Sequence, residues 1–117
     1  MTILDQLTGC ARERTVQAKL RISLEELKQQ ALSLPKGNFT FEKQSKPGLS
    51  FYLRVQKSLS IQRIIAQEFP YLQIAKDYEA AGADCISVLT EPKWFLGSDQ
   101  YLKKIADAVS VPCLRKD

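Results

Sequence analysis

The second half of the chain alternates short apolar runs with stretches of helical periodicity, and no other feature constrains the fold as strongly. One run alternates apolar and polar side chains, as a half-buried strand does. Residues 85–89 form a short continuous apolar run, as a strand covered on both faces does, and Val111-Pro112-Cys113-Leu114 begins a third strand. Strands that alternate with amphipathic helices form βαβ units with right-handed crossovers. The sequence therefore predicts an α/β fold with parallel strands near 49–55, 84–89 and 111–116, joined by helices near 70–81 and 98–109.

Proline, glycine and serine mark the ends of these elements. Pro70 stands at the first turn of its helix, where a missing N–H costs nothing. Gly82 suits the left-handed residue that follows a helix, and Ser98 is a good N-cap. Residues 57–69 are predicted to form a loop, with a short strand or turn at Ile64-Ile65.

The first 48 residues predict two helices and a connection. Apolar residues at helical spacing indicate a helix over residues 3–20. A second helix begins at Ser23, because a serine followed three residues later by Glu26 is the capping-box pattern, and it ends before Pro35. Residues 38–48 are predicted to form an irregular polar connection.

Length and composition predict one domain over residues 1–117, with a helical extension and connection over 1–48 and the strands over 49–117. The 17 basic and 13 acidic residues are spread without a block, so we expect no nucleic-acid partner. The chain has neither a signal pattern nor an apolar stretch near the roughly 20 residues of a membrane span. We therefore expect a cytoplasmic protein with no membrane partner.

The cysteines and the absence of histidine restrict the chemistry. Cys10, Cys85 and Cys113 are odd in number and far apart, so we expect buried free thiols and neither a disulfide framework nor a metal site. Without histidine, Ser-His and Cys-His catalysis and His-ligated zinc are excluded within this chain. Catalysis must use Lys, Asp, Glu or Tyr, and we expect no cofactor.

Three motifs carry a family resemblance. Residues 78–91 read YEAAGADCISVLTE, residues 94–102 read WFLGSDQYL, and residues 111–117 read VPCLRKD. In motif, spacing and order they closely resemble indole-3-glycerol phosphate synthases, whose pattern runs YE.AGA..(I/L)SVLT(E/D)...F.GS..YL and then (V/I)P.LRKDF. The opening Ile3-Leu4-Asp5 and the two leading helices resemble the family's N-terminal extension. The resemblance implies a partial (β/α)8 TIM barrel, made of the N-terminal helices and the first three parallel strands.

The resemblance also implies an activity and its residues. The family closes the ring of a carboxyphenylamino-deoxyribulose phosphate, with decarboxylation and dehydration, to give indole-3-glycerol phosphate, so the implied partner is a phosphorylated small molecule. The lysine of the LRKDF strand acts there as general acid, and that residue is Lys116 here. We expect it to be buried among barrel strands, where its proton affinity can be tuned. Phe95 matches an aromatic beside the substrate's anthranilate ring; otherwise it packs on the barrel rim. Ser87 is interpreted as filling the barrel interior.

The first strand departs from the family, which reads approximately FI(A/C)EVKKASPSKG. Arg54 occupies the position of a catalytic glutamate, and Gln56 occupies that of a catalytic lysine. When the family stretch is written as plausible codons and one base is inserted after the first codon, translation gives Phe51 to Arg54. When the later codons are read one base early, translation gives Lys57 to Arg63. Only Val55 does not match. A compensated frameshift over residues 52–63 is the hypothesis that we favour over a newly selected or designed sequence.

Three functional hypotheses follow. The first is a truncated family lyase that is inactive alone, because the chain stops after the third strand and lacks the phosphate loops after strands seven and eight. The second is another phosphate-binding barrel enzyme, such as a phosphoribosylanthranilate isomerase or a tryptophan synthase α chain; these lack the paired leading helices and the LRKD strand. The third is a non-catalytic piece that self-associates through open strand edges.

Overall fold

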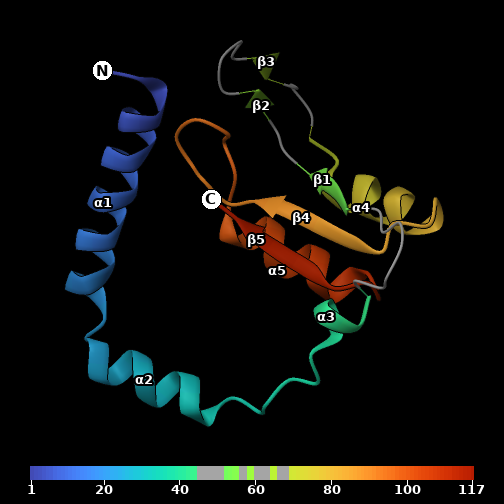
Figure 1. Ribbon diagram of the computed structural model, residues 1–117, viewed down its shortest axis with the longest axis horizontal. Coiled ribbons are helices and arrows are strands. Elements are labelled where there is room, and N and C mark those ends of the chain that lie inside the picture. Colours follow the sequence, from blue (N-terminus) through green and yellow to red (C-terminus); the bar gives the residue numbers. More distant parts are fainter. Residues whose placement is uncertain (45–51, 56–57, 60–63, 66–68) are drawn as a thin grey trace. The chain divides into compact units, whose positions relative to one another are not determined.

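The computed structural model describes residues 1–44, 52–55, 58–59, 64–65 and 69–117 (Figure 1). The chain divides into two compact units, Met1–Asn38 and Phe39–Asp117. The first unit is helical, and the second contains the parallel sheet with its covering helices.

The helical unit consists of α1 (Ile3–Arg21) and α2 (Leu24–Ser33), which confirms both predicted helices. Thr2 and Asp5 form a capping box at the start of α1. The Ser23 hydroxyl accepts a hydrogen bond from the Glu26 amide at the start of α2, as its sequence pattern predicts. These caps satisfy backbone donors at the first turn of each helix.

A short helix, α3 (Thr40–Gln44), lies where the sequence predicts only an irregular connection, so that part of the prediction is wrong. Pro35 and Gly37 correctly indicate that α2 ends before them. Phe39 then turns the chain with a positive φ of 59°, and α3 begins at the next residue. A five-residue helix is too short to leave a periodic apolar signal.

Three parallel strands form the sheet in the order β1-β4-β5, with bounds Tyr52–Val55, Cys85–Leu89 and Cys113–Lys116. Their parallel pairing confirms the central prediction of the sequence. The predicted start of the first strand, at 49–51, lies outside the described residues. The register places Arg54 opposite Ser87, and Ser87 opposite Leu114, in one row across the sheet.

Two helices, α4 (Tyr71–Ala80) and α5 (Asp99–Ala108), cover the same face of this sheet (Figure 1). They confirm the predicted helices, with Ser98 as the N-cap of α5 and Gly82, at a φ of 97°, just after the end of α4. Pro70 lies one position before the helix, as its N-cap rather than within its first turn. The core beneath the helices consists of Val55, Ala75, Ile86, Val88, Ile105 and Val109.

A second, smaller sheet lies in the segment predicted to be a loop. β2 (Ser58–Leu59) and β3 (Ile64–Ile65) pair antiparallel. The expected strand or turn at Ile64-Ile65 is therefore confirmed as a strand, whereas its partner was not predicted. Two residues are too few to show alternation in a sequence.

Two side chains of α4 fix the helix to its neighbours. The Tyr78 hydroxyl donates to the Arg54 carbonyl at 3.1 Å. The Glu79 carboxylate accepts from the backbone amides of Ser110 and Val111, in the turn between α5 and β5. One carboxylate thus links α4 to the turn between α5 and β5.

Replacing Glu79 tests this link. We expect Glu79→Ala to lower the free energy of unfolding by about 1–2 kcal/mol, because two amides lose a charged acceptor. Urea unfolding followed by far-UV circular dichroism measures the loss. Asp107→Ala, which removes one exposed carboxylate from α5, is the matched control and should change the free energy by less than about 0.5 kcal/mol. Equal losses in both variants would contradict the assignment.

Candidate functional site

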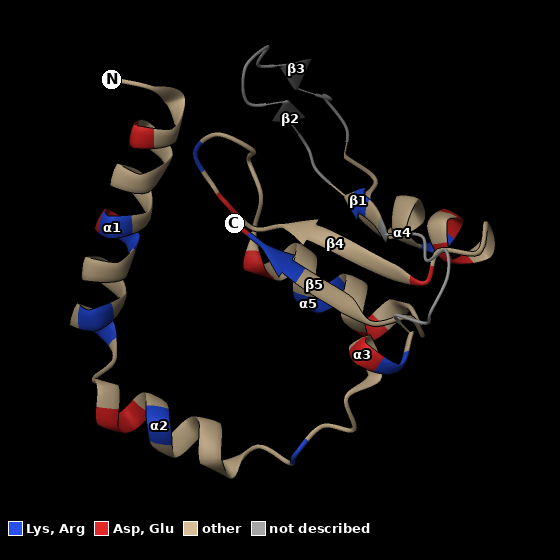
Figure 2. Cartoon of the chain, viewed as in Figure 1, with Lys and Arg blue, Asp and Glu red and all other residues tan. Residues whose placement is uncertain are grey.

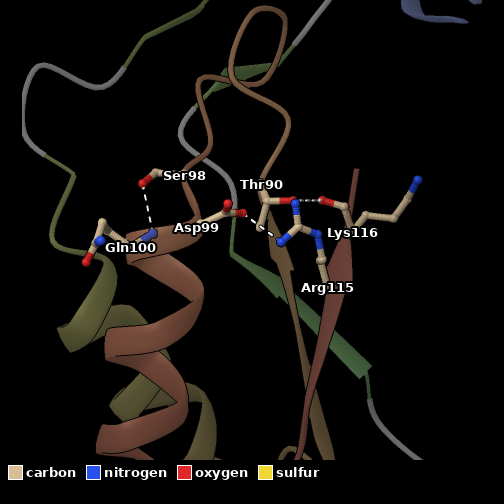
Figure 3. A network of polar contacts seen from close by, with 6 residues as sticks. All are labelled: Thr90, Ser98, Asp99, Gln100, Arg115 and Lys116. Atoms are coloured by element: carbon tan, nitrogen blue, oxygen red, sulfur yellow. Dashed lines mark hydrogen bonds and ion pairs between the residues drawn. The ribbon is translucent and has the colours of Figure 1, made fainter. Parts of the chain in front are cut away.

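The candidate site lies at the carboxyl ends of β4 and β5, which two hydrogen bonds hold together (Figure 3). The Lys116 carbonyl accepts from the Thr90 amide at 2.7 Å and from the Thr90 hydroxyl at 3.2 Å. Thr90 is only 4% exposed, so both bonds are shielded from water. The backbone of Lys116 is therefore fixed beside the end of β4.

Glu91 organises the loop that follows β4. Its side chain is 3% exposed and accepts three backbone hydrogen bonds from the loop itself. Oε1 accepts from Lys93 at 2.9 Å, and Oε2 accepts from Trp94 at 2.6 Å and from Phe95 at 2.9 Å. The Glu91 carbonyl also accepts from the Gly97 amide at 2.7 Å. These hydrogen bonds take the place of the water molecules that the carboxylate and the three amides would bind if they were exposed.

The end of the loop requires two unusual backbone positions. Leu96 has a positive φ of 52°, which is uncommon for a residue with a side chain. Gly97 passes so close to the Leu89 carbonyl that a Cβ atom there would overlap it. Glycine is therefore needed at position 97 for the loop to close over the end of β4.

The loop places two aromatic side chains beside the ends of the strands. Phe95 and Trp94 are both half-buried. The Trp94 indole N–H is itself buried and has no hydrogen-bond partner among the described residues. The structure thus brings Phe95, which the sequence singles out, to the same end of the sheet as Lys116.

Neighbouring residues of β5 point in opposite directions (Figure 3). Arg115 turns toward the start of α5 and pairs with Asp99 at 2.8 Å. Lys116 extends away from the helices, and its Nζ donates to the Asp117 carbonyl at 3.1 Å. Lys116 is exposed, so the expectation of a buried lysine is wrong for this chain, in which α4 and α5 cover only the opposite face of the sheet.

The face of the sheet opposite α4 and α5 carries a cleft of about 460 Å³. Arg54 and Lys116 both line it, so one aligned family position and the candidate general acid share one face of the sheet. Ser87 lies between their strands and is half-buried, facing the same cleft. The other aligned position, Gln56, lies outside the described residues, as does most of the stretch interpreted as frameshifted. The cleft lining consists of Phe41, Arg54, Cys85, Ile86, Ser87, Leu114 and Lys116.

The cysteines are free, as predicted, but only Cys85 is buried; Cys10 and Cys113 are half-buried. Burial, followed by the nearby Asp84 carboxylate, raises the pKa of the Cys85 thiol. Burial also raises the pKa of Cys113, with smaller contributions from Cys85 and Glu79. Thiols with raised pKa values stay protonated near neutral pH and are poor nucleophiles.

The described residues were also compared with the requirements of a metal site and of a membrane-spanning helix. Over residues 1–44, 52–55, 58–59, 64–65 and 69–117, no three His, Cys, Asp or Glu side chains gather where they could hold a metal ion. None of the helices described is long and apolar enough to cross a membrane.

Two functional features of the site were missed from the sequence. Thr90 and Glu91 appear there only as letters of a motif, without a role. A glutamate two residues after an apolar strand and six residues before a glycine is a signal for a closed loop, but its three amide partners depend on backbone geometry that no periodicity encodes.

Comparison with known proteins matches residues 4–117 to the family model described as indole-3-glycerol phosphate synthase. Among relatives with that name, the protein of Ruminiclostridium cellulolyticum is 48% identical over 117 residues, covering 98% of this chain and 45% of the relative. The protein of Endomicrobium trichonymphae is 44% identical over 117 residues, with the same two coverages. That of Lactiplantibacillus plantarum is 44% identical over 116 residues, covering 98% of this chain and 44% of the relative.

The chain thus spans a little less than half the length of these relatives. Its three parallel strands and covering helices are consistent with part of a TIM barrel. The family model extends over nearly the whole chain, from the first turn of α1 to the end of β5. The chain belongs to the indole-3-glycerol phosphate synthase family.

Proposed function

We propose that this chain is part of a lyase that closes and decarboxylates 1-(2-carboxyphenylamino)-1-deoxyribulose 5-phosphate in tryptophan biosynthesis, and that the 117 residues alone do not catalyse the reaction. The observation that carries the proposal is the family match over residues 4–117, which ends at the LRKD strand. Barrel enzymes of this kind place their catalytic groups at the carboxyl ends of strands, where Lys116 stands. We place the reaction in the cytoplasm.

Lys116 is the proposed general acid. Its backbone is fixed by Thr90, while its side chain extends from the face opposite α4 and α5, on which the rest of a barrel interior would close. A charged ammonium can donate a proton to a substrate carbonyl as negative charge develops there. In a complete barrel, surrounding strands would remove water from this lysine and bring its proton affinity closer to neutrality.

Phe95 is the proposed aromatic wall for the anthranilate ring. Its position depends on the Glu91 carboxylate, which accepts the Phe95 amide directly. A ring held by a closed loop loses little conformational freedom when a substrate binds, which favours affinity. This support for Phe95 is independent of the family motif.

Arg54 and Gln56 occupy the positions that we assign to a lost glutamate and a lost lysine. Arg54 reverses the charge at the cleft that Lys116 lines. Proton transfer and charge stabilisation both require the correct sign at such positions, so each change would remove an interaction made in the transition state. The remaining barrel strands and their phosphate-binding loops would have to come from outside these 117 residues.

Activity measurements test the lyase proposal. We expect no measurable indole-3-glycerol phosphate from this chain with the carboxyphenylamino-deoxyribulose phosphate, by chromatographic assay. Joined to the missing strands of the Ruminiclostridium cellulolyticum relative, the chain should gain activity by several orders of magnitude when Arg54→Glu and Gln56→Lys are introduced together. The unrepaired chimera is the control. If it equals the repaired one, the roles assigned to positions 54 and 56 are wrong.

The single tryptophan of the chain reports on the Glu91 loop directly. We expect Glu91→Ala to shift Trp94 emission to longer wavelength, raise its quenching by acrylamide, and cost about 1–3 kcal/mol of stability, because three amides lose their acceptor. Asp107→Ala is the control and should leave the emission unchanged. An unaltered spectrum in Glu91→Ala would show that the carboxylate does not hold the loop.

A self-associating, non-catalytic role is the second candidate, because β1 and β5 are the outer strands of the described three-stranded sheet. Outer strand edges and a cleft face opposite α4 and α5 favour contact between copies. We expect the purified chain to elute from size exclusion as oligomers, or to aggregate. A monodisperse monomer with one cooperative unfolding transition would eliminate this candidate.

A further inference from the structure

The side chain of Trp94 carries a polar group that the closed loop leaves unsatisfied. Its indole N–H is buried and has no hydrogen-bond partner in the part of the chain that the structure describes. A buried donor without an acceptor loses the hydrogen bond that water would give it. Because Trp94 lies between Glu91 and Gly97, this cost falls on the closed arrangement of the loop.

The loop has few acceptors to offer this N–H. Figure 2 shows the charged positions of the chain, and along this loop they are one acidic residue, Glu91, and one basic residue, Lys93. Both Glu91 oxygens already accept backbone amides, and the Ser98 hydroxyl accepts from the Gln100 amide at 3.0 Å. The Lys93 ammonium, 5.9 Å from the centre of the Trp94 ring, is only a donor. The loop therefore uses these acceptors for its backbone and leaves the indole without one.

A second cost falls on the same loop. Leu96 has a φ of 52°, in the left-handed region that residues with a side chain rarely adopt. Against these two costs stand the three amides that the Glu91 carboxylate holds and the bond from the Gly97 amide to the Glu91 carbonyl. The closed loop is thus a balance between strong bonds at Glu91 and unfavourable terms at Trp94 and Leu96.

The loop also lies apart from the core of the sheet. Trp94, Phe95 and Leu96 are half-buried, yet none of the three belongs to the core cluster under α4 and α5 or packs against it in the described structure. Opening the loop would therefore expose little of the surface that holds the strands and helices together. Segments with few core contacts open at a lower free energy than the whole domain.

We propose that residues 91–97 form a strap with two arrangements, the closed one of this structure and an open one in which the Trp94 N–H is hydrated, and that the strap opens without unfolding of the sheet. The amides of Trp94 and Phe95 share one Glu91 oxygen, so Phe95 moves with the strap. The consequence for Phe95 as an aromatic wall rests on the proposed function, whereas the opening itself does not.

Amide hydrogen exchange of the 117-residue chain, followed by NMR, tests the opening separately from any catalysis. The Phe95 amide reports on the strap because it donates to Glu91, and the Ile86 amide, which donates to Pro112, reports on the sheet. We expect the protection factor of Phe95 to be at least about tenfold below that of Ile86. Equal protection factors would show that the strap opens only when the sheet does, and would overturn the proposal.

Replacing Trp94 with β-(3-benzothienyl)alanine tests the cause of the opening. Its ring has the shape of indole with sulfur in place of the N–H, so the unsatisfied donor is removed and the packing is retained. We expect the protection factor of Phe95 to rise about tenfold, equivalent to about 1.4 kcal/mol. The control is 5-fluorotryptophan, which keeps the N–H and should change that factor by less than about threefold. A benzothienyl residue that fails to raise the factor, or a fluorinated one that raises it equally, would overturn the proposal.

Discussion

The burial of β4 is the constraint on which the rest of the α/β unit depends. This strand pairs with β1 on one side and β5 on the other, and four of its five residues are buried. Its helix-facing side chains, Ile86 and Val88, contribute to the core that α4 and α5 cover. Because both neighbours are parallel to β4, all three strands end at the same edge, where the candidate site lies.

Two polar side chains at this edge fix the positions of the neighbouring strand and loop. Thr90 holds the last residues of β5, and Glu91 holds the loop that carries Phe95. Both residues are almost fully buried and bonded to backbone groups, so they fix the geometry of this edge. Arg54 and Lys116, which are both exposed, line the cleft beside this edge.

The sequence predicts the large elements well because their signals are long and repeated. Alternating apolar runs, Ser98 and Gly82 gave the parallel strands and the helix boundaries. The elements that it did not predict, α3 and β2, are five and two residues long, too short for any period to appear. The exposure of Lys116 was missed because the burial of a strand end depends on neighbouring strands, which the residues of that strand do not encode.

The pairing of the ends of β4 and β5 is the central claim, because it sets the position of Lys116 and of the cleft. Amide hydrogen exchange followed by NMR tests it at two positions. The Ile86 amide donates to Pro112 at 3.0 Å and the Thr90 amide donates to Lys116 at 2.7 Å, one at each end of the pairing. Slow exchange at both amides is the predicted result. Fast exchange at Thr90 beside a protected Ile86 would show that the strands separate before the site, and would contradict the account.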